Sequence, residues 1–396
     1  MLGTIGIFLG FAVLLFCVWK KYNLILAALL LGIPLLCAVL GGYDDVLVGV
    51  KAFPPRTEDW GFNPEKLWNV RRPFNWLWFL GFTAFTLACL FPFLWRGLRS
   101  LIAKRRPTAV YGMGRFPWWG WIGLLVLVGG WVVAWSRFPC FRSCQAIISY
   151  FPVWMGYIFT MNAVCVWRKR TCPMIEHPLA YALTFPASSL FWWFFEYLNR
   201  FVWNWYYLGI DDMGAGEYTF YATICFASVL PAVYVTAEVL GTFRFFDDRL
   251  YDDMGWRPNV RSWPSCLVLA VLSLVGLTGI VFLPAYTYPL LWISPLMVFV
   301  LVQVLLGEAS VLDQLKRGSW GQIFRFEVAA LVCGVCWETW NYYAYAKWVY
   351  AVPWVHRWQI WEMPIIGFAG YLPFGVECAA VIYWLYDGLR IHLPVR

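Results

Sequence analysis

Long runs of apolar residues recur from one end of this 396-residue chain to the other. A helix needs roughly 20 predominantly apolar residues to cross the hydrocarbon core of a bilayer. Only 13% of the residues are charged, against about 25% in a soluble domain, and no stretch between the runs is long enough for a separate soluble domain. The sequence therefore predicts an all-α polytopic membrane protein with a single membrane domain over residues 1–396. We place eleven spans at 3–19, 23–40, 73–95, 117–135, 148–167, 178–207, 218–241, 263–283, 287–306, 322–345 and 358–387.

The basic residues predict how these spans are oriented. Short cytoplasmic loops retain Lys and Arg, and with eleven spans the basic clusters all fall on one side: 20–21, 96–106, 168–170, 244–261, 316–317 and 390–396. We therefore expect a multi-pass protein of the cell (inner) membrane with its N-terminus outside, an outer loop at 41–72 and a cytoplasmic C-terminus. The first apolar run lacks a basic start and a cleavage site, so we expect a retained span. The net charge of +8 then reflects topology, and we expect no nucleic-acid partner.

The outer ends of four predicted helices are evenly spaced. Phe151, Tyr218, Tyr288 and Trp358 follow one another at intervals of 67, 70 and 70 residues. This spacing suggests a parallel internal repeat of helical hairpins, although any series of similar hairpins gives roughly even spacing. The candidate repeats are 117–172, 178–245, 262–315 and 322–390.

Two aromatic-rich segments carry the same polar pair. The segment FWWFFEYLNRFVWNWYY (191–207) contains Glu196 and Asn199, and CWETWNYYAYAKWVY (336–350) contains Glu338 and Asn341. Each residue of one pair is 142 positions from its counterpart, which is about two repeat periods. Three aromatic pairs also coincide at this offset: Phe201 with Tyr343, Trp203 with Tyr345, and Tyr206 with Trp348.

On continuous helices, the Glu, the Asn and the later aromatics would share one stripe. If the aromatics at 206 and 348 mark the outer interface, each glutamate lies about 15 Å deeper, near the midplane. A charged group there costs at least roughly 2.5 kcal/mol unless it is paired, protonated or hydrated. We therefore predict a polar intramembrane pocket, with helix packing by hydrogen-bonded glutamates as the alternative.

The candidate site residues follow from this prediction. Glu196 and Glu338 are the candidate catalytic groups. For Arg200, an ion pair with Glu196 one turn away on the same helix is the simpler role. The candidate substrate-binding residues are Asn199, Asn341, Arg200, Glu238, Glu377, Trp203 and Trp348.

Three functions remain open from the sequence. The first is an enzyme acting on a lipid or isoprenoid, with the glutamates as acid, base or charge stabiliser and Trp-rich walls around the hydrophobic small molecule. A lipid-linked glycosyltransferase using Asp44, Asp45 or Asp59 of the outer loop is a variant of it. The second is a transporter or channel coupled to protons or cations, against which we count the absence of obvious broken helix pairs. The third is a scaffold subunit of a membrane complex.

The segment WVYAVPWVHRWQIWEMP, residues 348–364, resembles the aromatic-flanked spans of the small carotenoid cyclases, which carry Pro and carboxylates. This resemblance covers less than a tenth of the chain and implies isoprenoid chemistry. The doubled glutamate expected after proline in that family is missing here.

The remaining reactive residues indicate no cofactor and no metal. The three histidines, His177, His356 and His392, occupy different segments, which disfavours paired haem ligation and His-rich di-iron sites. Cys333 and Cys336 have redox-pair spacing but lie in an apolar span, where packing is the better interpretation. Cys140 and Cys144 lie in a loop, and the sequence leaves open whether they pair. It also leaves the oligomeric state open.

Overall fold

The fold is described from a computed structural model, in which residues 72–103, 114–136, 150–210, 213, 215–391 and 393 are placed. The predicted spans at 3–19 and 23–40, the outer loop apart from Arg72, and Cys140 with Cys144 lie outside the described residues, and so does the side chain of Arg200.

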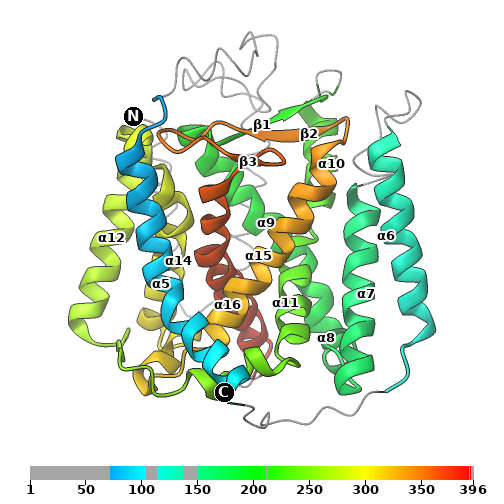
Figure 1. Cartoon of the computed structure of the whole chain (residues 1–396), viewed down its shortest axis with the longest axis horizontal. Coiled ribbons are helices and arrows are strands. Elements are labelled where there is room, and N and C mark those ends of the chain that lie inside the picture. The colour runs from blue at the N-terminus through cyan, green and yellow to red at the C-terminus, as the bar shows by residue number, and fades with distance from the viewer. Residues whose placement is uncertain are drawn as a thin grey trace.

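The described chain is a bundle of helices standing side by side, with two short β-ribbons across one end (Figure 1). The α-helices are α5 (Trp76–Ile102), α6 (Trp118–Ser136), α7 (Phe151–Lys169), α8 (Pro173–Glu176), α9 (Pro178–Val202), α10 (Ala215–Phe226), α11 (Val229–Leu240), α12 (Trp263–Phe282), α13 (Pro284–Thr287), α14 (Ser294–Leu306), α15 (Gly321–Tyr342) and α16 (Tyr371–Gly388). The 3-10 helices are η4 (Arg244–Phe246), η5 (Asp248–Tyr251), η6 (Tyr288–Trp292), η7 (Val311–Arg317) and η8 (Ile365–Gly370). The strands are β1 (Trp205–Leu208), β2 (Lys347–Tyr350), β3 (Gln359–Ile360) and β4 (Met363–Pro364).

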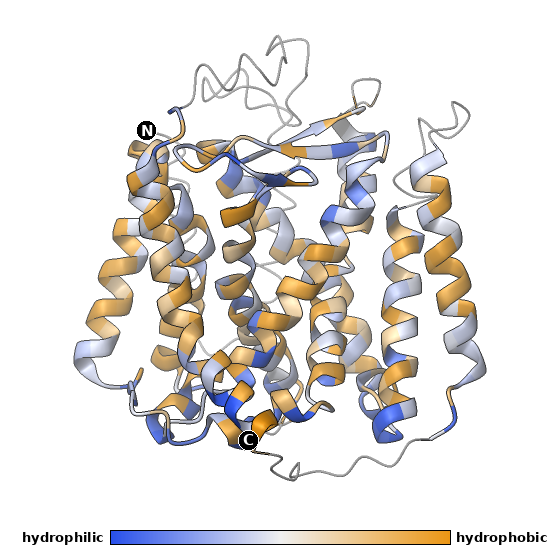
Figure 2. Cartoon of the chain, viewed as in Figure 1, coloured by the Kyte–Doolittle hydropathy of each residue, from blue (hydrophilic) through white to orange (hydrophobic). Residues whose placement is uncertain are grey.

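Five helical segments of the described chain are long and apolar enough to cross a membrane: Trp76–Ile102, Trp118–Ser136, Gly216–Leu240, Trp263–Phe282 and Ile365–Gly388. A bent pair, Pro284–Trp292 with Ser294–Leu306, makes a sixth if it is counted as one span. Hydrophobic residues follow the length of the helices, and hydrophilic ones gather near their ends (Figure 2). These features support a helical integral membrane protein, and the total of eleven spans remains a prediction.

The outermost helices present apolar side chains to their surroundings. Examples on α5, α6 and α12 are Leu77, Phe85, Trp118, Leu125 and Trp263, all of them exposed. Exposed apolar surface on this scale marks an interaction with lipid or protein. This surface fits helices that face the hydrocarbon core.

Three predicted spans differ from the structure at the ends nearest the β-ribbons. The helix predicted over 178–207 ends at Val202, where Trp203 adopts a left-handed conformation with φ 55°. The helix predicted over 322–345 ends at Tyr342, and residues 358–370 form β3, β4 and η8 instead of the start of a long helix. The later aromatics therefore lie beyond the helices, and the predicted single stripe is wrong.

Glycines allow the helices of each hairpin to approach closely. A Cβ atom added at Gly156 of α7 would overlap the backbone of Leu127 in α6. One added at Gly375 of α16 would overlap the carbonyl group of Phe326 in α15. Small residues at such crossings are typical of helix pairs in membranes. The pairs α6–α7, α12–α14 and α15–α16 are in contact, which suits hairpins, while the proposed duplication remains a prediction.

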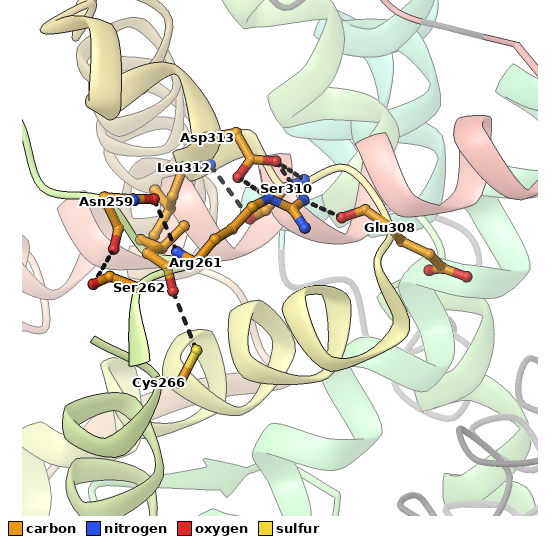
Figure 3. Close-up of polar contacts among 9 residues, drawn as sticks. Asn259, Arg261, Ser262, Cys266, Glu308, Ser310, Leu312 and Asp313 are labelled. Carbon is orange, nitrogen blue, oxygen red and sulfur yellow. Dashed lines mark hydrogen bonds and ion pairs between the residues drawn. The ribbon is translucent and has the colours of Figure 1, made fainter. Parts of the chain in front are cut away.

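Charged groups gather at the end of the bundle opposite the ribbons. Asp313 of η7 accepts two hydrogen bonds of 2.7 Å from the guanidinium group of Arg261. Its second carboxylate oxygen also accepts a bond of 2.8 Å from the Ser310 backbone N–H, which completes a capping box. Figure 3 shows Arg261 reaching from the start of α12 to this capped turn. The hydrogen bonds that Arg261 donates to Asp313 raise the pKa of Arg261 above its usual value, so the cation persists across the accessible pH range.

This network predicts unequal effects for two identical substitutions. Asp313→Asn is expected to lower the free energy of unfolding by about 1–2 kcal/mol, because it removes a bidentate ion pair and weakens a helix cap. Asp253→Asn removes an ion pair with Arg257 whose carboxylate side chain is 81% exposed, and it should cost less than about 0.5 kcal/mol. Denaturant unfolding of both variants in detergent micelles measures the difference. Equal losses would contradict the assigned role of Asp313.

Candidate functional site

Asn199 folds the chain back at the end of α9. Its side-chain amide donates to the carbonyl oxygen of Trp205 at 2.9 Å. Its side-chain oxygen accepts from the backbone N–H groups of Asn204 at 2.8 Å and Trp205 at 3.4 Å. These bonds satisfy backbone groups of Asn204 and Trp205, which lie just beyond the end of the helix. They start β1 directly over the end of the helix.

Asn341 does the same at the end of α15. Its amide donates to the carbonyl oxygen of Trp348 at 2.8 Å, and its oxygen accepts from the Trp348 backbone N–H at 2.9 Å. Asn199 and Asn341 are 8% and 1% exposed. Both asparagines that we predicted to bind substrate therefore hydrogen-bond to the backbone of the segment after their helix. Neither side chain lines the cavity described below.

β1 and β2 pair as an antiparallel ribbon over the end of the bundle (Figure 1). Trp205 is opposite Tyr350, and Tyr207 is opposite Trp348. Side chains alternate along a strand, so these four rings share one face of the ribbon. Each strand contributes a Trp-x-Tyr sequence, and the register relates the two by an approximate local two-fold axis.

Glu196 is surrounded by three aromatic hydrogen-bond donors. One of its carboxylate oxygens, Oε1, accepts from the indole N–H groups of Trp192 and Trp205 at 3.0 Å each and from the Tyr207 hydroxyl at 2.5 Å. Glu196 is 2% exposed. Buried carboxylates need such partners, and here the ribbon supplies two of the three.

Glu338 has an equivalent set of donors. Its Oε1 accepts from the Trp348 indole N–H at 3.4 Å, the Tyr350 hydroxyl at 2.6 Å and the Tyr371 hydroxyl at 3.1 Å. Glu338 is fully buried, and its other oxygen has no hydrogen-bond partner among the described residues.

The third donor distinguishes the two glutamates. Trp192 precedes Glu196 by one helical turn, and the equivalent position before Glu338 is Gly334. The ring of Tyr371, from α16, occupies the space that a side chain at Gly334 would need. The third donor to Glu196 is thus a residue of the same helix, Trp192, whereas the third donor to Glu338 is Tyr371 from a neighbouring helix.

The aromatic residues after Asn199 and those after Asn341 correspond in the structure with a shift of one residue from the pairing that we expected from the sequence. Trp205 corresponds to Trp348 and Tyr207 to Tyr350, because each pair makes the same bonds to its glutamate. The expected match of Tyr206 with Trp348 is wrong, since the segment after Asn341 is one residue longer. The expected separation of about 15 Å between Trp348 and Glu338 is wrong too, because Trp348 folds back and its indole N–H lies 3.4 Å from the Glu338 carboxylate.

A cavity of about 140 Å³ lies between the ribbon and the helix ends. All six donors to the two glutamates line it, whereas the carboxylates lie one layer behind its wall. Lys347 is the single charged residue on the described lining, and its ammonium group pairs with Glu362. The other aromatic residues on the lining are Tyr150, Tyr218, Tyr221, Phe226, Trp292, Trp337 and Trp340.

The remaining predicted site residues lie elsewhere, apart from Trp348. Glu238 forms an ion pair of 2.5 Å with Lys169. Glu377 is fully buried and accepts from the Leu296 backbone N–H at 2.9 Å in the first turn of α14. Trp203 ends α9 and does not line the cavity. The structure thus brings Glu196, Glu338 and Trp348 together around one cavity and leaves the others outside it.

Sequence reasoning missed five of the six donors. Trp192, Trp205, Tyr207, Tyr350 and Tyr371 were not predicted as site residues. A Trp-x-Tyr sequence begins six residues after Asn199 and seven residues after Asn341. This recurrence identifies four of the six donors, namely Trp205, Tyr207, Trp348 and Tyr350. Tyr371 has no such local signal, because it comes from another helix.

The described residues show no metal centre. Among them, no group of three His, Cys, Asp or Glu side chains is arranged to hold a metal ion. Cys333 of α15 is buried, and its sulfur lies 3.5 Å from the hydroxyl of Thr236 in the neighbouring helix α11. This contact fits the packing role expected for it.

Comparisons with protein-family models, with curated proteins and with solved structures find no match to this chain.

Proposed function

We propose that the protein is a membrane-embedded enzyme whose lipid or isoprenoid substrate enters the aromatic cavity beneath the β1–β2 ribbon. The observation that carries this proposal is that the donors to both buried glutamates line one cavity. An apolar pocket with a few convergent polar groups is the usual form of a site for a hydrophobic molecule. Burying a carboxylate is costly even when it is hydrogen-bonded, so two such groups behind one cavity favour a functional role.

The rings, rather than the glutamates, meet the substrate. Tyr207 and Tyr350 line the cavity and donate to Glu196 and Glu338, respectively. A hydroxyl that donates to a carboxylate has a more electron-rich oxygen, because hydrogen bonds in a chain polarise one another. The glutamates thus act as positioning residues and charge stabilisers, and Asn199 and Asn341 hold the strands that carry the rings.

The size of the cavity limits what it takes in. A cavity of about 140 Å³ is comparable to one that holds a benzene molecule. It is far smaller than a whole lipid. We therefore propose that a ring-sized end group of the substrate occupies it while the apolar chain extends along the helices.

Bound lipid measured by mass spectrometry tests this function. We expect one molecular species to co-purify with the protein and to fall at least tenfold in Glu196→Gln and Glu338→Gln, because the neutral amide loosens the rings that form the wall. Glu238→Gln, the same change at the Lys169 ion pair, should retain it. Equal lipid content in all four proteins would contradict the proposal.

One observation supports the transporter alternative. Pro284–Trp292 and Ser294–Leu306 form a span bent by 49°, so the described chain does contain a broken helix. At the break, Glu377 accepts from the start of α14, and its second oxygen has no partner among the described residues. Broken helices with a carboxylate are typical of ion-coupled transporters. Proton or cation flux into liposomes that is lost in Glu377→Gln and retained in Glu338→Gln would favour this function.

A further inference from the structure

We propose that the cavity recognises a quaternary ammonium group, so that the natural ligand is an amphiphile with a methylated cationic end. The inference rests on the proposed function only in taking the aromatic cavity as the ligand site. Three features of the cavity lead to it: its ring wall, the carboxylates behind that wall and its size.

The wall of the cavity is a continuous series of aromatic rings. Trp205, Trp192, Trp337 and Tyr371 follow one another with centroid separations of 6.1, 5.3 and 6.4 Å and interplanar angles of 39°, 37° and 18°. Ring faces carry negative electrostatic potential. A cation within about 6 Å of such faces is attracted, most strongly by Trp, and quaternary ammonium groups are the ligands that aromatic cages commonly bind.

The hydrogen bonds favour the ionised form of both carboxylates. Each Oε1 accepts three donors, and donors to the charged form of a carboxyl group stabilise that form. In this form, a negative charge lies behind the rings at each glutamate. Lys347 does not balance these charges, since it pairs with Glu362.

The arrangement favours a quaternary over a primary ammonium group. The indole and hydroxyl groups of Trp205, Tyr207, Tyr350 and Tyr371 already point their hydrogens at the glutamates. A primary ammonium group brings three donors that need acceptors, and the described lining offers them tyrosine hydroxyls but no carboxylate. A methylated group brings no donor and needs none of these acceptors. A trimethylammonium group also has the ring-like size that a cavity of about 140 Å³ can hold.

Choline and its neutral isostere, 3,3-dimethylbutan-1-ol, separate charge from shape. We expect the full-length protein in maltoside micelles to bind choline at least about tenfold more tightly than the alcohol, as measured by isothermal titration calorimetry. In Glu196→Gln and Glu338→Gln this preference should fall toward unity, while Glu238→Gln keeps it. Because the preference is a ratio within each protein, a general loss of stability does not change it. Equal binding of both probes by the native protein, or no binding of choline, would overturn the inference.

Lipid vesicles then identify the source of the cation. If a membrane lipid supplies it, vesicles of phosphatidylcholine should compete with choline, and vesicles of phosphatidylglycerol should not. If a free cationic amphiphile supplies it, neither lipid competes, and dodecyltrimethylammonium does. A cavity that retains a bound isoprenoid or lipid but shows no preference for choline would contradict this inference alone. A cavity that binds no hydrophobic molecule would contradict the proposed function instead.

Discussion

Replacing Glu338 by Leu is expected to lower the free energy of unfolding by about 3–5 kcal/mol, because three buried donors lose their common acceptor at once. The donors are the indole N–H of Trp348 and the hydroxyls of Tyr350 and Tyr371. Denaturant unfolding in detergent micelles, or the thermal midpoint of a fluorescence scan, measures the loss. Glu338→Gln retains an acceptor oxygen and should cost about 1–2 kcal/mol.

The matched control is Glu217→Leu, an identical change at an exposed residue in the first turn of α10. It should alter stability by less than about 0.5 kcal/mol. A Glu338→Leu protein as stable as this control would show that the carboxylate does not hold the ribbon against the helices.

Gly334→Leu is expected to lower the free energy of unfolding by about 3 kcal/mol, because a side chain at this position overlaps the ring of Tyr371. The displaced ring also loses its bond to Glu338 and moves into the cavity that it lines. The variant should therefore lose bound ligand as well as stability. Calorimetry with choline and unfolding in micelles measure the two effects separately.

Two further variants separate crowding from hydrogen bonding. Gly388→Leu places the same side chain at the end of α16, where nothing lies within 4 Å of an added Cβ, and it should be nearly neutral. Tyr371→Phe keeps the ring and removes only the hydroxyl, which should cost about 1 kcal/mol. If Gly334→Leu behaved like Gly388→Leu, the close approach of α15 and α16 at this point would be refuted.

The class of the fold and the centre of the candidate site could be predicted from sequence because both leave local signals. Apolar runs that are long enough to cross a bilayer as a helix indicate a membrane protein. Glu196 with Asn199 and Glu338 with Asn341 stand out because polar pairs are costly among aromatic residues in a membrane. The structure brings the donors of both glutamates to one cavity.

The β1–β2 ribbon could not be predicted in the same way. Trp and Tyr are common at membrane interfaces and in strands alike, so WNWYYL after Asn199 suits a helix end as well as a strand. Which of these forms depends on the pairing of β1 with β2, far along the chain. Packing between separate helices determines the one-residue shift between the two units and the contribution of Tyr371. Such packing leaves no periodic pattern in a single sequence.

The two glutamate clusters differ in how soon they can assemble as the chain emerges from the ribosome. Every donor to Glu196 lies within 11 residues of it, whereas Glu338 requires Tyr371, which follows 33 residues later. β1 has to wait still longer for its partner strand, and contacts distant in sequence form slowly. A nascent chain that has passed β1 but not yet reached β2 therefore has a completed first cluster beside an unpaired strand edge. The ribbon cannot form before β2 has been synthesised, so translation pauses between the two strands prolong the stage at which this edge is open to wrong partners.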